Sequence, residues 1–201
     1  MEVAGEMAHR SAIPVFLLPV LDSLPAMAHL WQTALLLIGL STLATAQAAS
    51  RPDVPDKIKA PAGEEIVLHA HASGSQIYVC QQGADQKFAW VFKAPEAELH
   101  DRQGAVIGKH YAGPSWKHKD GSEVTGKVAA KFDPPDKDSI PWLLLTATSH
   151  SGNGVLSRVT SIQRINTKSG QPPSGGCDAS KEKVEVKSSY TADYYFYAPA
   201  K

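Results

Sequence analysis

The sequence predicts an all-β protein: a single antiparallel β-sandwich or barrel of about nine short strands. Several segments alternate apolar and polar residues, as strands do when one face is buried. Turn-forming residues separate these segments at spacings of roughly 8–12 residues. The chain also contains 15 Gly and 14 Pro, which suit strands and turns better than a helical bundle. Together these observations predict one all-β domain over residues 63–201.

The expected elements follow one another from residue 49 to the C-terminus. Residues 49–62 are rich in Pro and polar side chains and predict an extended lead-in. The stretch 140–147 (IPWLLLTA) is apolar and predicts a central strand buried on both faces. A strand beginning at Phe88 is expected to end before Pro95. The other expected strands are 66–72, 76–82, short strands between 104 and 120, 124–131, 155–167 and 189–198, with turns at 72–75, 101–104, 120–121 and 152–154.

The first 48 residues predict an export signal. Residues 31–44 form an apolar run that is short for a membrane span, which takes roughly 20 residues. Ala46-Gln47-Ala48 is a small-residue motif that predicts cleavage after Ala48. Translation is expected to start at Met27, because Pro and Asp interrupt the apolar residues of 1–26. The mature chain would then be residues 49–201, secreted or periplasmic, with no membrane span.

The charge balance argues against one class of function. Twenty Lys and Arg residues are matched by 20 Asp and Glu residues. A nucleic-acid-binding protein needs a basic face that displaces counterions from phosphates. We therefore expect no nucleic-acid partner, and nothing in the composition predicts an oligomeric state.

The chain has two cysteines, Cys80 and Cys177. In an exported domain two cysteines pair more often than not, so we expect a disulfide between them. Two separate buried thiols are the alternative. A zinc site built on these cysteines is not expected, because no C-x-x-C motif accompanies them.

Several phrases resemble an uncharacterised family of exported bacterial and fungal proteins, known only as a domain of unknown function. The resemblance implies a secreted domain of this size without an established activity. Some fungal members carry the label malate dehydrogenase, which this sequence does not support because it lacks a G-x-G-x-x-G after a strand and a βαβ unit. The matching stretches are GSQIYVC (74–80), FAWVFKAPEAEL (88–99), GKHYAGPSW (108–116), DGSEVTGKV (120–128), IPWLLL (140–145), SGNGVLSRVTSIQRINTKSG (151–170) and YTADYYFY (190–197).

His69 and His71 form an H-x-H motif that places two imidazoles on the same face of a strand. Two neutral imidazoles are half of a copper or zinc site, and a histidine or carboxylate on a neighbouring strand would complete it. The alternative is the solvated face of an edge strand. If a metal binds here, the protein is a metal-dependent enzyme or a metal-handling protein; otherwise no cofactor is expected.

A second candidate site lies around the Gly113-Pro114 turn, which would bring His110 and Trp116 to the same end of the fold. An aromatic face beside an imidazole and a carboxylate suits a sugar or another small ligand. The alternative is structural, with Trp116 in the core, Asp120 in a hairpin turn and His110 exposed. The candidate ligand-binding residues are His110, Tyr111, Trp116 and Asp120.

The sequence contains no complete catalytic set. Ser149 and His150 are adjacent on an expected strand and point to opposite faces, and no G-x-S-x-G motif is present. Arg158 and Arg164 are candidate anion contacts or part of a solvated face. We predict a secreted non-catalytic β-domain that binds a small molecule, a glycan or a protein. A metal-dependent function through the histidine pair is the alternative.

Overall fold

A computed structural model describes residues 50–201 of the chain. The predicted export signal, with its start at Met27 and its cleavage after Ala48, lies outside these residues. Over residues 50–201 the secondary structure consists of eight strands and two short 3-10 turns, which confirms the all-β prediction. Within the same range, none of the helices is both long and apolar enough to cross a membrane.

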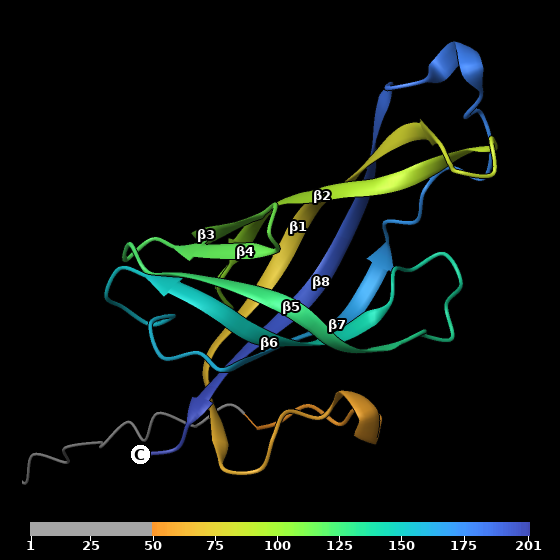
Figure 1. Cartoon of the computed structure of the whole chain (residues 1–201). Coiled ribbons are helices and arrows are strands. Elements are labelled where there is room, and N and C mark those ends of the chain that lie inside the picture. The colour runs from red at the N-terminus through yellow and green to blue at the C-terminus, as the bar shows by residue number, and fades with distance from the viewer. Residues whose placement is uncertain (1–49) are drawn as a thin grey trace, which may run out of the picture. The chain divides into compact units, whose positions relative to one another are not determined.

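The eight strands form one closed antiparallel barrel (Figure 1). Each strand pairs with its neighbours in sequence, and β8 returns to pair with β1 along most of its length. Closure decides between the two predicted architectures, because a sandwich would leave two separate sheets. The strands are β1 (Glu64–Gln82), β2 (Phe88–His100), β3 (Val106–Tyr111), β4 (Ser115–His118), β5 (Glu123–Phe132), β6 (Trp142–Ser151), β7 (Ser161–Ser169) and β8 (Glu185–Pro199).

The turn predicted at 72–75 is wrong, and it accounts for the difference between nine strands and eight. A single strand, β1, runs through this segment for 19 residues. Gly74 pairs with both neighbouring strands here, and a Cβ atom on Gly74 would collide with the carbonyl oxygen of Glu96. Gly74 therefore allows the backbones of β1 and β2 to approach each other closely and does not turn the chain.

Two other boundaries and the burial of one strand differ from the prediction. Strand β2 continues through Pro95 to His100, and the register shift opposite Ile77 and Tyr78 lies beside that proline, as expected for Pro next to a bulge. Residues 155–158 form turns, residues 159 and 160 have no regular structure, and β7 begins only at Ser161. Strand β6 is not buried on both faces, because a barrel strand has one interior and one exterior face.

The barrel interior holds the main hydrophobic core. Alternate residues of β8 point inward, among them Tyr190, Tyr194 and Phe196, and they meet Ala70 and Ala72 of β1. This alternation is what a half-buried strand requires, since successive side chains point to opposite faces. Aromatic rings of β8 therefore form one side of the barrel interior.

Residues 50–62 cover part of the outside of the barrel. They contain the 3-10 turn η1 (Asp56–Ile58), and Val54 and Ile58 pack with Ile165 of β7. The side-chain amide of Gln163 donates a hydrogen bond to the carbonyl of Ile58 at 2.6 Å. This segment thus buries the outward-facing side chains of β7.

Cys80 and Cys177 form a disulfide, as predicted. In Figure 1, β1, β2 and the start of β8 extend beyond the other strands, and the disulfide joins this end of β1 to the loop before β8. Beside it, the Cys80 amide donates to the Val184 carbonyl at 2.9 Å and the Lys183 amide donates to the Cys80 carbonyl at 2.8 Å. The bond therefore holds the segment that leads into the closing strand.

Candidate functional site

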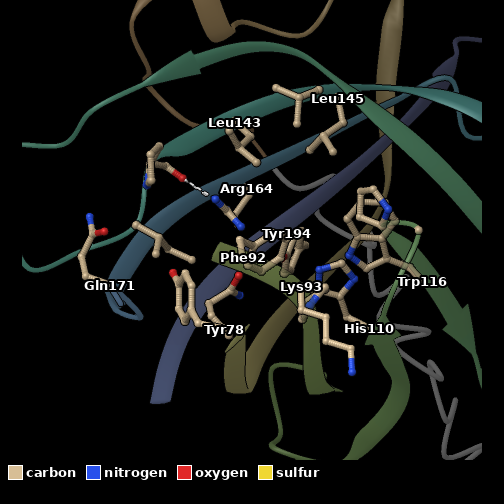
Figure 2. Close-up of a pocket in the computed structure, with 17 residues that line it drawn as sticks. Tyr78, Phe92, Lys93, His110, Trp116, Leu143, Leu145, Arg164, Gln171 and Tyr194 are labelled. Carbon is tan, nitrogen blue, oxygen red and sulfur yellow. Dashed lines mark hydrogen bonds between the residues drawn. The ribbon is translucent and has the colours of Figure 1, made fainter. Parts of the chain in front are cut away.

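The barrel contains a cavity of about 460 Å³ (Figure 2). All eight strands contribute side chains to it. Its walls are mostly aliphatic and aromatic, and a few polar groups lie among them. Ligand sites in proteins typically enclose roughly 300–1,000 Å³ and have this mixture of walls. The cavity is therefore large enough for one small molecule.

His110 and Trp116 lie together in the wall of this cavity. They are opposite each other on β3 and β4, and their rings stack with centroids 4.5 Å apart. His110 is 3% exposed and Trp116 is 1% exposed. The sequence anticipated that the two residues lie together, and both side chains are buried in the wall of a cavity whose edge carries the exposed residues Phe92 and Val128.

The protonation state of His110 follows from its surroundings. Its Nδ1 atom lies 2.9 Å from the Ser115 carbonyl oxygen, which only accepts, so Nδ1 carries the hydrogen and Nε2 has the lone pair. Burial lowers the pKa of His110 to about 3; the bond to Ser115 opposes this shift and the charge of Arg164 adds to it. His110 is therefore neutral at pH 7.

Acid should destabilise the protein through His110. The unfolded chain binds a proton near the free-histidine pKa of about 6.5, whereas folded His110 does so only at about 3. Between these values the unfolded state holds more protons, so stability falls as the pH falls. From pH 7 to pH 5, His110 should contribute a loss of about 2 kcal/mol in the free energy of unfolding.

Urea unfolding of wild type and His110→Gln at both pH values measures this contribution. Glutamine does not titrate, so the variant should lack this part of the pH dependence. Equal pH dependence of wild type and variant would contradict the assignment of a buried, neutral His110.

Tyr111 and Asp120, the other two candidate ligand contacts, do not belong to the lining of this cavity. Asp120 accepts hydrogen bonds from the Ser122 amide at 2.9 Å and from the Val155 amide at 2.8 Å. It thereby ties the turn between β4 and β5 to the segment that precedes β7. Tyr111 follows His110 on β3 and is partly exposed.

His69 and His71 lie on the outer face of β1, and both approach Asp193 of β8. The distances to its Oδ1 atom are 3.7 Å from His69 Nε2 and 3.0 Å from His71 Nδ1. Burial raises the pKa of Asp193, but hydrogen bonding with His69, Asn166 and His71 outweighs it and holds the pKa well below its usual range. Within residues 50–201, no group of three or more His, Cys, Asp or Glu is arranged to hold a metal ion. The metal site therefore stays a prediction.

Arg158 and Arg164, the two candidate anion contacts, lie in different surroundings. Arg158 is exposed and donates to the Pro199 carbonyl at 3.0 Å. Arg164 lines the cavity, and its Nε and Nη2 atoms donate to the Pro141 carbonyl at 3.2 and 2.8 Å (Figure 2). Of the two, Arg164 alone faces the interior.

Sequence reasoning missed most of the lining, including the polar residues Gln76, Tyr78 and Tyr194. Gln76 and Tyr78 share the inward face of β1 with Ala70 and Ala72. That alternation was visible in the sequence, but the turn expected at 72–75 interrupted it. Tyr194 lies on the strand expected at 189–198, but the sequence pattern alone does not indicate that its side chain lines a cavity.

The fold and the cavity together define a closed eight-stranded antiparallel barrel with an interior large enough for one small ligand. The chain belongs to the family described as Protein of unknown function (DUF3455), whose model matches residues 61–198. This match confirms the resemblance seen in the sequence. No curated protein and no solved structure matches the chain.

Proposed function

We propose that the protein is a non-catalytic binding module that holds one small amphipathic molecule inside its barrel. The observation that carries this proposal is the cavity of about 460 Å³ with a mostly apolar lining. Phe92 and Val128 belong to that lining and are 50% and 53% exposed. A pair of large apolar side chains at the edge of an apolar cavity is what a hydrophobic ligand would cover.

The lining favours binding over catalysis. Its ionisable side chains are Tyr78, Lys93, His110, Arg164 and Tyr194, and among the described residues that form it there is no Asp, Glu, Ser or Cys. A nucleophile or a general base needs a partner that orients and activates it. The Nδ1–H of His110 donates to the Ser115 carbonyl and leaves Nε2 free, but burial lowers the pKa of His110 to about 3, so Nε2 is a weak base.

The apolar walls favour a small amphipathic molecule over a glycan or a protein. Sugars need many polar partners, whereas Ile140, Leu143 and Leu145 offer hydrocarbon. We place the binding outside the cytoplasm, because a disulfide such as Cys80–Cys177 persists in oxidising compartments.

A neutral apolar probe tests this proposal. N-phenyl-1-naphthylamine is weakly fluorescent in water and bright in apolar sites, so a fluorescence titration should give saturable binding at about one probe per chain. Phe92→Asn should weaken that binding about threefold to tenfold, since it removes an apolar contact at the cavity.

Val91→Asn is the matched control. Val91 is the neighbouring residue, 42% exposed, and does not line the cavity, so the same substitution should leave probe binding unchanged. Absence of saturable binding in the wild type, or equal effects of the two substitutions, would contradict binding in the barrel.

A further inference from the structure

Arg164 places a positive charge beside the cavity without a carboxylate to balance it. The ion pairs formed among residues 50–201 do not include Arg164. A guanidinium has five N–H donors, and the bonds from Nε and Nη2 to the Pro141 carbonyl use only part of them. A partly buried charge is costly to leave unpaired, so a ligand that supplied a negative charge would be stabilised here.

Three buried polar groups of the cavity wall form no well-aligned hydrogen bond, although Arg164, Trp116 and Tyr190 are polar neighbours of the Tyr194 hydroxyl. They are Nε2 of Gln76, Nε1 of Trp116 and the hydroxyl of Tyr194, and all three residues line the same cavity. Buried polar atoms are nearly always hydrogen-bonded. Burial raises the pKa of Tyr194, although Arg164 opposes the shift, so the phenol keeps its proton and donates. The amide and the indole donate as well.

We propose that these four residues, Gln76, Trp116, Arg164 and Tyr194, bind the carboxylate of a small monocarboxylic acid whose apolar body fills the rest of the cavity. We call them the donor cluster. A carboxylate only accepts hydrogen bonds, and it therefore complements a group of donors. Arginine binds it with two parallel N–H bonds. This inference rests on the proposed function and specifies the ligand class.

The charges around the cavity match a single negative charge. His110 stacks on Trp116 and is neutral, so it adds no second cation. Lys93 also lines the cavity, but it is paired with Glu185. Arg164 is thus the one uncompensated cation of the lining within residues 50–201, which suits a monocarboxylate better than a phosphate dianion.

Two probes that differ only in the charged group test the inference. Naphthalene-2-carboxylate and naphthalene-2-methanol share one apolar body, and calorimetric titration at pH 7.5 gives the affinity of each. We expect the carboxylate to bind at least about tenfold more tightly, since hydrogen bonds to a charged group are stronger than neutral ones.

Arg164→Met should abolish this preference, so that the variant binds the carboxylate no more tightly than the alcohol. Arg158→Met is the matched control, because Arg158 also donates to a proline carbonyl but is exposed. It should preserve the tenfold preference. Arg164→Lys keeps the positive charge and replaces Arg164→Met in the test if the methionine variant does not fold. The lysine variant should retain a reduced preference for the carboxylate.

The outcomes separate the two proposals. If neither probe binds, the proposed function fails and the ligand class fails with it. If the alcohol binds as tightly as the carboxylate to the wild type, or if Arg164→Met keeps the tenfold preference, the carboxylate assignment is overturned while the barrel remains a binding site.

Discussion

Replacement of both Cys80 and Cys177 by alanine is expected to lower the free energy of unfolding by about 2–5 kcal/mol. The disulfide closes a loop with a sequence separation of 97 residues. In the chain-entropy model a loop of about 100 residues restricts the unfolded chain by about 4.7 kcal/mol. The bond also holds the loop that leads into β8, and β8 closes the barrel against β1.

Urea unfolding with and without dithiothreitol provides the measurement and its control. The reductant should lower the unfolding midpoint of the wild type to that of the double alanine variant, and it should leave the variant unchanged. If reduction leaves the wild-type midpoint where it is, the disulfide contributes little to stability and β8 is held by its strand pairing alone.

Trp116→Ala is expected to lower the free energy of unfolding by about 3–5 kcal/mol. The indole is almost fully buried and meets Tyr194 and Phe196 edge to face, at centroid distances of 5.5 and 5.9 Å. Its loss would also uncover one face of His110, which stacks on it. The cost combines lost apolar burial with the cavity that the missing ring leaves.

Trp90→Ala provides the control for this effect. Trp90 lies on β2, is only half-buried, and donates from Nε1 to the Gly175 carbonyl at 2.8 Å. It should cost about 1–2 kcal/mol, because a hydrogen bond and partial burial are lost without an internal cavity. Urea unfolding that ranks Trp116→Ala no higher than Trp90→Ala would contradict the placement of Trp116 in the core.

The strands could be predicted because the alternation of apolar and polar residues is a local pattern. The disulfide could be predicted because cysteines pair in the oxidising compartments that exported proteins reach. Alternation predicted the strand at 189–198, which the structure shows as part of β8, and the presence of two cysteines in a chain predicted to be exported indicated their pairing. The continuity of β1 through Gly74 could not be recognised in the same way. Glycine marks a turn or a close approach of two backbones, and only the neighbouring strands decide between them.

The candidate site was predictable in part. The short connection around Gly113-Pro114 placed His110 and Trp116 together, since a hairpin brings nearby residues opposite each other. The role of Arg164 depends on which face of β7 is interior. That face is set by pairing with β8, where Arg164 lies opposite Tyr194, and by closure of β8 on β1. Such long-range pairings leave no local pattern in the sequence.

A crystal structure of the protein with naphthalene-2-carboxylate tests most directly whether the barrel holds a small carboxylic acid. We expect the naphthalene ring among Ile140, Leu143 and Leu145, with the carboxylate oxygens about 2.7–2.9 Å from the Arg164 guanidinium. A carboxylate turned away from Arg164 toward solvent, or a ligand bound on the outer face of the barrel, would contradict this account.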